Sequence, residues 1–366
     1  KASWGGGGRG MRPINNVDEL ADKVREGRRE AEAAFGNGEG YLEKMILRAR
    51  HVEVQILGDT HGDIYHLYER DCSVQRRNQK VVERAPAPYL SAAQRSEICD
   101  LGRKICAHVG YECAGTVEFL MDMDSGKFYF IEVNPRVQVE HTVTEEVTGI
   151  DIVQAQIMIA EGKTLAVATG KDRQEDIQLT GHALQTRITT EDPQNNFIPD
   201  YGRISAYRSA TGLGVRLDGG TAYAGAVITR YYDSLLVKIT TKGPSPKTAI
   251  ARMDRALREF RIRGVKTNIG FLEKVMTHPV FLEGACDTSF LDKHPEVFEM
   301  REKLDRANKI LSFVGHTTVN GYPGIAPEKA LQYRDLRKPD MPEIPYGSQH
   351  PRGSRHSGCC CGHAVG

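Results

Sequence analysis

Two glutamates and an asparagine near the middle of the chain have the spacing of a metal site. Apolar residues flank Asp124-Ser125-Gly126, a turn signal, so the segment predicts a β-hairpin. A turn centred on Ser125 places Glu118 opposite Glu132, and Asn134 lies on the same face because alternate residues of a strand share a side. Such oxygen ligands favour a hard cation such as Mg²⁺, with room for nucleotide phosphates. Two glutamates facing solvent on an edge hairpin would show the same spacing.

A run of alternating polar and apolar residues follows directly, from Asn134 to Glu140. In an extended chain Arg136, Gln138 and Glu140 share the side of Asn134, while the intervening valines face the other way. That side would carry a metal ligand, a permanent cation that can hold an anion through two hydrogen bonds, and a possible general base. The run therefore favours the metal and nucleotide interpretation over a solvent-facing hairpin.

The composition is that of a soluble globular protein with two or more domains. The chain has 366 residues, of which 40% are hydrophobic, and a formal charge of +1. This balance gives no reason to expect nucleic acid as a partner, and no apolar run approaches the roughly twenty residues of a membrane span. The chain begins at Lys1 without an initiator Met and shows no targeting segment, so any native leader would already be missing.

The cysteines fall into two groups. One group is scattered without metal-ligand spacing, which is typical of buried thiols in a reducing compartment: Cys72, Cys99, Cys106, Cys113 and Cys286. In the other, Cys359, Cys360 and Cys361 form a run, with His356 and His363 close by. A metal or lipid site is one interpretation of this run, but three adjacent cysteines do not easily converge on one ion, so we expect a disordered tail.

The elements that must position these residues begin with a glycine-rich segment, residues 1–10. Glycines let successive backbone N–H groups face an anion such as phosphate, although a flexible linker would also be rich in glycine. Residues 17–35 predict an amphipathic helix that Asn16 or Asp18 caps and that ends at Gly36.

The next segments alternate between strands and helices. Residues 51–57 and 64–68 predict a second hairpin, and the polar segment 69–80 that follows is most simply a solvated surface loop. Helices are predicted at 91–110, where Ser91 is the N-cap, and at 143–161.

The pattern changes near residue 174. Strands are predicted at 181–188, 202–208, 215–217 and 234–240, and a helix at 247–259. Residues 180–290 therefore predict a separate α+β domain whose Arg187 could reach the first one. Residues 296–313 predict mostly helix, and the composition from about residue 337 predicts poor order.

Several segments resemble the biotin carboxylase component of biotin-dependent carboxylases: 1–12, 50–55, 69–77, 130–141 and 231–235. The resemblance covers residues 1 to about 290 and implies an α+β protein, a partial ATP-grasp fold followed by the biotin carboxylase C-terminal domain. The implied divisions are an ATP-grasp lid with the glycine-rich loop (1–45), the ATP-grasp catalytic subdomain (46–175), the C-terminal domain (176–292), a helical linker (293–336) and a disordered tail (337–366).

Further segments are similar to pyruvate carboxylases in particular: 260–268, 286–292, 306–309 and 319–321. The resemblance thus implies a ligase that carboxylates biotin with ATP and bicarbonate, as part of an enzyme that forms oxaloacetate.

The resemblance also implies roles for individual residues. The implied nucleotide contacts are Lys1, Gly5, Gly6, Gly7, Gly8, Glu43, His51, Gln75 and Asn78. The implied ligands of Mg²⁺ or Mn²⁺ are Glu118, Glu132 and Asn134. The implied bicarbonate-binding and catalytic residues are Lys80, Arg136, Gln138, Val139, Glu140 and Arg187.

In this scheme Glu140 deprotonates bicarbonate, which then attacks the γ-phosphate of ATP. The resulting carboxyphosphate releases CO₂ and phosphate, and phosphate removes the ureido proton of biotin. Arg187 stabilises the enolate, because a permanent cation lowers the cost of that charge where water is excluded.

The sequence departs from the family pattern in two ways. Asn78 stands where the family usually has His; it can hydrogen-bond a nucleotide hydroxyl but carries no charge, so affinity is expected to suffer more than chemistry. The family's first lobe, the start of its lid, a Met-Lys-Met biotinylation motif and a carboxyltransferase region are not found, so we expect this chain to be an N-terminally truncated fragment.

Two hypotheses follow. The chain is an enzyme component that carboxylates biotin on a carrier domain elsewhere, or it is a non-catalytic fragment that binds MgATP weakly or only associates with intact subunits. A third, an ATP-grasp carboxylate–amine ligase, is disfavoured because residues 136–141 and Arg187 suit bicarbonate and a ureido enolate. The resemblance implies a homo-oligomer of the full-length enzyme, in the cytoplasm or the mitochondrion, with the cytoplasm slightly favoured.

Overall fold

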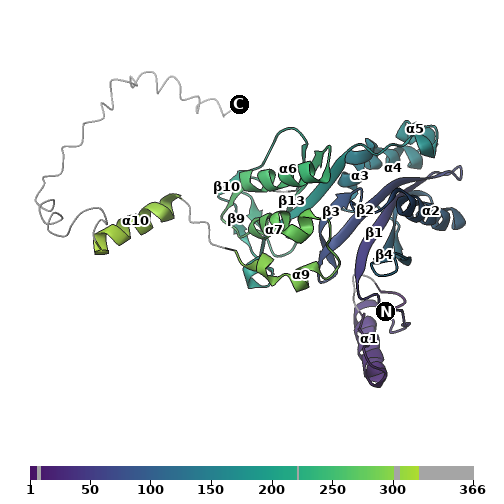
Figure 1. The fold of residues 1–366 in the computed structure, drawn as a ribbon, viewed down its shortest axis with the longest axis horizontal. Coiled ribbons are helices and arrows are strands. Elements are labelled where there is room, and N and C mark those ends of the chain that lie inside the picture. Colours follow the sequence, from purple (N-terminus) through teal and green to yellow (C-terminus); the bar gives the residue numbers. More distant parts are fainter. Residues whose placement is uncertain (6–9, 221, 301–305, 321–366) are drawn as a thin grey trace, which may run out of the picture. The chain divides into compact units, whose positions relative to one another are not determined.

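The computed structural model describes residues 1–5, 10–220, 222–300 and 306–320 (Figure 1). The chain forms two units, Lys1–Met300 and Arg301–Gly366. In the second unit the described element is helix α10, Arg306–Asn320, which lies within the predicted helical linker. The predicted tail and its cysteine run lie outside the described residues.

An antiparallel sheet, the helices that cover it and short two-stranded ladders make up Lys1–Met300. The sheet has eight strands in the order β11-β13-β6-β3-β2-β1-β4-β5. The strands are β1 Ala49–Gly58, β2 Ile64–Arg76, β3 Gln79–Ala85, β4 Cys113–Asp122, β5 Phe128–Asn134, β6 His182–Thr189, β11 Val215–Gly219 and β13 Leu235–Gly243. Short ladders pair β7 Glu191–Asp192 with β8 Ile198–Pro199, β9 Gly202–Arg203 with β12 Val227–Ile228, and β10 Ala206–Arg208 with β14 Arg261–Arg263.

Helices pack on this sheet and form its hydrophobic cores. The α-helices are α1 Leu20–Phe35, α2 Ala92–His108, α3 His141–Thr148, α4 Ile152–Ala160, α5 Leu165–Thr169, α6 Pro246–Glu259, α7 Ile269–Thr277, α8 Pro279–Leu282 and α9 Phe290–Lys293. The 3₁₀ turns are η1 Val17–Glu19, η2 Gln174–Asp176, η3 Pro193–Asn195 and η4 Pro295–Phe298. Helix α2 packs on β1 and β2, α3 on β6, and α6 on β13. The largest core lies beneath α6 and α7, at the β6 and β13 end of the sheet (Figure 1).

The predicted central hairpin is confirmed. Strands β4 and β5 pair with Glu118 opposite Glu132, as a turn centred on Ser125 requires, and Asn134 pairs with Thr116 one rung further on the same face. The preceding helix α2 begins after Ser91. The Ser91 hydroxyl accepts a hydrogen bond from the backbone N–H of Gln94, as part of a capping box.

The single helix predicted at residues 143–161 is wrong, because the structure divides it into α3 and α4. Gly149 ends α3 with φ of +73°, a backbone conformation that glycine adopts without strain. Asp151 then caps the start of α4, because its carboxylate accepts a hydrogen bond from the backbone N–H of Gln154. The apolar spacing continued across the break, but the glycine and the capping aspartate mark the boundary.

The surface loop considered for residues 69–80 is also wrong. Strand β2 continues to Arg76, a tight turn follows, and β3 returns. Glu69, Arg70 and Asp71 are at most 1% exposed. Their charges are tolerated inside because each has an ion-pair partner: Arg70 and Asp71 pair across strands with Glu53 and Arg84, and Glu69 pairs with Arg95 on helix α2.

The sheet runs through the division predicted between residues 175 and 176. Strands β6, β11 and β13 follow that point in the chain, yet β6 pairs with β3 and joins the earlier strands in one sheet. Residues from both sides of the division can therefore meet on one face. No helix among the described residues has the length and hydropathy needed to cross a bilayer.

Candidate active site

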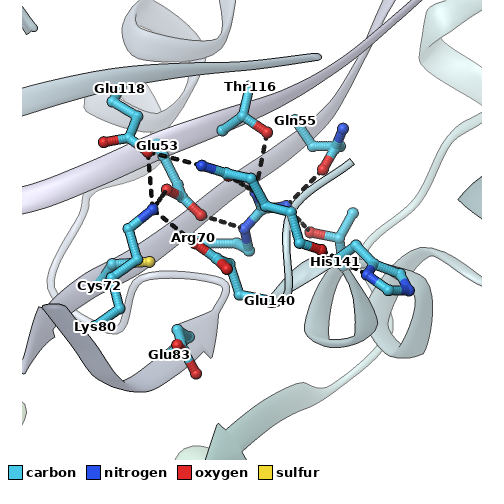
Figure 2. Close-up of polar contacts among 12 residues, drawn as sticks. Glu53, Gln55, Arg70, Cys72, Lys80, Glu83, Thr116, Glu118, Glu140 and His141 are labelled. Carbon is cyan, nitrogen blue, oxygen red and sulfur yellow. Dashed lines mark hydrogen bonds and ion pairs between the residues drawn. The ribbon is translucent and has the colours of Figure 1, made fainter. Parts of the chain in front are cut away.

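Ionisable side chains form one row across four adjacent strands. In the register of the sheet, Glu53 on β1 pairs with Arg70 on β2 and with Glu118 on β4, and Glu118 pairs with Glu132 on β5. Residues at one rung point to the same side of a sheet, so the fold itself brings these charges together. Figure 2 shows Glu53, Arg70 and Glu118 converging with Lys80 and Glu140.

Lys80 holds three carboxylates. Its ammonium donates to Glu53, to Glu118 Oε1 at 2.8 Å and to Glu140 Oε1 at 2.6 Å (Figure 2). Burial opposes the charged form, but Glu53, Glu140 and Glu118 together raise the pKa of Lys80 above its ordinary value. The side chain is therefore a fixed cation at the centre of the cluster.

Arg70, on strand β2, supports this row of side chains through hydrogen bonds. Its guanidinium is fully buried and donates to Glu53 at 2.6 Å and to Gln138 Oε1 at 3.0 Å. It also donates to Gln55, Thr116 and Thr144. The amide of Gln138 in turn donates to Glu118 at 2.8 Å. Because each donor has an acceptor, Arg70 fixes the orientation of Gln138.

Arg187 reaches the cluster from β6. Its Nη2 donates to Glu83 at 2.7 Å and to Glu140 Oε2 at 3.1 Å. Burial raises the pKa of Glu83, Arg187 opposes this and Glu140 adds to it. The Nε of Arg187 is buried and finds no hydrogen-bond partner in the described part of the chain. Arg187 thus keeps a donor available beside Glu140.

Glu118 is held by several polar side chains besides Lys80. His51 Nε2 lies 2.8 Å from it, at ion-pair distance but without hydrogen-bond geometry, and Gln75 lies against the other ring nitrogen of His51. Burial raises the pKa of Glu118, but His51 and Lys80 outweigh this and hold it well below its ordinary value. Glu118 is therefore an anion that can serve a cation at neutral pH.

The three predicted metal ligands lie close together. The Asn134 amide lies 2.9 Å from Glu118 Oε1 and 3.5 Å from Glu132 Oε1, so the three side chains meet. A half-turn of the Asn134 amide group would direct its oxygen toward Glu118 and Glu132 and present three oxygen ligands. Hard oxygen donors of this kind are the ones Mg²⁺ takes.

The segment predicted to bind bicarbonate does not have the extended form that was predicted for it. Residues after Asn134 bend and turn rather than extend, so the alternation fails at Arg136. Gln138 and Glu140 are buried, whereas Arg136 is exposed and donates to Asn134 at 3.4 Å. The residue after Asn134 is Pro135, which has no backbone N–H to hydrogen-bond a neighbouring strand. The strand therefore ends at Asn134.

Lys238 holds the turn at Val139. Its ammonium donates to the Val139 carbonyl at 3.1 Å, from a β13 position that pairs with Arg187. Burial lowers the pKa of Lys238, and Asp218 opposes this.

The remaining predicted nucleotide contacts come from the N-terminal segment and from the turn between β2 and β3. Lys1 approaches Glu43 at 3.6 Å and donates to the Ile131 carbonyl on β5. Asn78 occupies the β2–β3 turn with φ of 63°, a left-handed conformation that asparagine tolerates. Gly5 precedes the segment 6–9, so Gly6, Gly7 and Gly8 lie outside the described residues.

Sequence reasoning missed Glu53, Glu83 and Lys238. A signal for the first existed, because His51, Glu53 and Gln55 alternate with apolar residues on β1 and therefore share one face. Glu83 and Lys238 carry no comparable local pattern; strand pairing between distant segments places them.

Acid is expected to weaken the contribution of Glu118 to stability. Its folded pKa is lower than its ordinary value of 4.5, so this contribution is complete above pH 4.5 and is lost as pH falls through the folded pKa. Urea unfolding of the parent and of Glu118→Gln at pH 7 and at successively lower pH measures it. The stability difference between the two chains should shrink with acid; a constant difference would contradict the assignment.

Two family descriptions match the sequence. Residues 1–168 match "Carbamoyl-phosphate synthase L chain, ATP binding domain", and residues 185–293 match "Biotin carboxylase C-terminal domain", together more than half of the chain. Pyruvate carboxylase 1 of Caenorhabditis elegans is 52% identical over 359 residues, which are 97% of this chain and 30% of that protein. The chain thus spans about a third of the length of the curated relatives it matches.

Solved structures agree with this assignment. A Rhizobium etli pyruvate carboxylase, the T882A variant with acetyl coenzyme A, matches with a TM-score of 0.81 and 65% identity, covering 88% of this chain and 29% of that one. The biotin carboxylase domain of Hydrogenobacter thermophilus 2-oxoglutarate carboxylase, solved as a dimer with MgADP, ADP and bicarbonate, matches with a TM-score of 0.78 and 45% identity, covering 82% of this chain and 65% of that one. The ATP-grasp and biotin carboxylase C-terminal folds, the paired family matches and these relatives show that the chain belongs to the biotin carboxylase family of biotin-dependent carboxylases.

Proposed function

We propose that this chain carries out the ATP- and bicarbonate-dependent carboxylation of biotin, as part of a pyruvate carboxylase that forms oxaloacetate. The observation that supports it best is the position of Glu140. Its carboxylate lies between two fixed cations, Lys80 at 2.6 Å and Arg187 at 3.1 Å. Each carboxylate oxygen keeps a lone pair, so Glu140 can still accept a proton from bicarbonate held beside these cations.

Bicarbonate would bind to Lys80, Gln138 and the backbone at Val139. Gln138 is already oriented by Arg70, and Val139 by Lys238. Arg136 would have to turn away from Asn134 to join them. Its side chain is exposed, so it has room to change rotamer. Glu140 takes the bicarbonate proton, and the oxygen so freed attacks the γ-phosphorus of ATP while ADP leaves as the other product.

The nucleotide would lie along β1, β2 and β5. Lys1, Gly5, Glu43, His51, Gln75 and Asn78 are the residues proposed to hold it. Glu118, Glu132 and Asn134 would bind Mg²⁺ or Mn²⁺, which when bound neutralises charge that develops during phosphoryl transfer. The lowered pKa of Glu118 supports this role, because an ionised carboxylate is the form that a cation requires.

Biotin would react at Arg187. Phosphate released from carboxyphosphate removes the ureido proton, and the negative oxygen that results accepts a hydrogen bond from the guanidinium. The buried Nε without a partner in the described residues supports this step. The lid, catalytic and C-terminal divisions at 1–45, 46–175 and 176–292 are proposed as functional divisions, of which the last two share one continuous sheet.

The wider setting is also a proposal. The full-length enzyme would present biotin on a carrier domain and would form a homo-oligomer, in the cytoplasm or the mitochondrion. The solved dimer of the Hydrogenobacter domain supports the oligomer.

The test measures phosphate release from ATP by the purified chain with Mg²⁺, with and without bicarbonate and free biotin. We expect release that requires bicarbonate, rises with biotin and falls about 10²–10⁴-fold in Glu140→Gln, which keeps the shape but cannot act as the base. Absence of release from a folded chain that still binds MgATP would overturn autonomous activity and favour the non-catalytic fragment.

A further inference from the structure

A cluster of two histidines and a glutamate lies in the segment after α7, away in sequence from the strands that form the active site. His278 stands between α7 and α8, His294 follows α9, and Glu296 belongs to η4. The helices α7 and α9 that flank it are labelled in Figure 1. The fold therefore brings together imidazole and carboxylate groups that the carboxylase chemistry does not use.

The ligand atoms converge on one carboxylate oxygen. His278 Nε2 and His294 Nδ1 each lie 3.0 Å from Glu296 Oε1, and the two rings are 4.4 Å apart between centroids. All three ligand atoms lie within 4.8 Å of one another. Ligands of tetrahedral Zn²⁺ at ordinary bond lengths are about 3.3 Å apart. Small side-chain shifts would therefore bring the three atoms onto one ion.

We propose that His278, His294 and Glu296 bind a divalent transition metal ion of the Zn²⁺ class. Two imidazoles and one carboxylate are a common donor set for zinc. Mg²⁺ prefers oxygen ligands, so a site with two imidazoles favours Zn²⁺ over Mg²⁺. Glu296 is half exposed, with 52% of its side chain accessible, so water can fill the fourth position. The ion would cross-link the end of α7 to η4, the last turn before Met300.

The alternative is a cluster held by hydrogen bonds without a metal ion, in which each imidazole donates a hydrogen bond to Glu296. In that arrangement Glu296 Oε1 accepts a hydrogen bond from His278 Nε2 and one from His294 Nδ1, each at 3.0 Å. A divalent ion bound at His278 Nε2 and His294 Nδ1 would take the place of these two hydrogen bonds, and each neutral ring would then carry its proton on the other nitrogen. His278 Nδ1 is buried without a hydrogen-bond partner among the described residues, so the usual outer hydrogen bond is missing and the affinity should be moderate.

The test titrates Co²⁺, whose absorption reports its ligands, into the full chain with excess Mg²⁺ present. The parent chain for the test carries Cys359→Ser, Cys360→Ser and Cys361→Ser, so that the tail supplies no thiolates. We expect visible absorption that saturates at about one equivalent and that Zn²⁺ abolishes. His294→Asn and Glu296→Gln should each weaken Co²⁺ binding more than about tenfold.

Two controls make the outcome decisive. His108→Asn removes an exposed histidine at the end of α2 and should leave Co²⁺ binding unchanged. Thermal unfolding checks that the site variants remain folded, and Zn²⁺ should raise the midpoint in the parent more than in either variant. Absence of Co²⁺ absorption, or absorption that survives both substitutions in folded protein, would overturn the proposal.

Discussion

Arg187→Met is expected to lower biotin-dependent turnover about 10²–10³-fold, the cost of removing one donor to a developing oxyanion. Methionine preserves most of the side-chain volume but removes the charge and the buried Nε donor that has no partner in the described residues. Bicarbonate-dependent cleavage of ATP without biotin should fall much less, because Lys80 still holds Glu140 at 2.6 Å. Phosphate release measured with and without biotin separates the two effects.

The matched control uses Arg173, an exposed arginine whose ion pair with Asp176 lies outside the cluster. Arg173→Met should leave both rates unchanged. Arg187→Lys keeps a charge without the planar fork and should recover only part of the biotin-dependent rate. Equal loss of both rates in Arg187→Met would show instead that Arg187 acts earlier, through its contact with Glu140.

The part of the site that sequence reasoning predicted is the part that local geometry determines. A hairpin with a short turn fixes its own register, so the opposition of Glu118 and Glu132 followed from the position of Ser125 alone. The direction of Asn134 followed from strand periodicity in the same way. Family resemblance then supplied roles that spacing leaves open, such as that of Arg187.

The parts that were missed depend on pairing between distant segments. The polar segment after Tyr68 was interpreted as surface because isolated charges are costly to bury. In the structure Arg70 lies beside Glu53, and Asp71 beside Arg84, so the cost is offset by partners that a local pattern does not reveal. Lys238 likewise reaches Val139 only because β13 joins the sheet through β6.

Arg136 shows the opposite error. Alternation in the sequence was extended past the end of a strand, and Pro135 stands where the ladder stops. Residues beyond it are placed by the turn into α3, which buries Gln138 and Glu140 regardless of their period. A periodic pattern therefore predicts a shared face only as far as the element continues.

Arg70→Met is expected to destabilise the compact unit by about 3–5 kcal/mol, the range for breaking a buried ion pair by removing one partner. The guanidinium is fully buried, and its loss leaves Glu53 with Lys80 as its remaining cation. Urea or thermal unfolding of the parent and the variant measures the change. Arg25→Met, at an exposed surface pair with Asp22, should change stability by less than about 1 kcal/mol.

The second substitution, Glu53→Gln, separates the role of Arg70 in stability from its role in the site. The double variant, Arg70→Met with Glu53→Gln, lacks both members of the buried ion pair. The Glu53 carboxylate is then no longer buried without its Arg70 partner, so part of the stability should return. Activity should not return with it, because Gln138 Oε1 still lacks the hydrogen bond that the Arg70 guanidinium donates to it at 3.0 Å. Recovery of bicarbonate-dependent ATP cleavage together with stability would show that Gln138 needs no such support. Continued loss of activity in a restabilised chain would identify Arg70 as a positioning residue for bicarbonate.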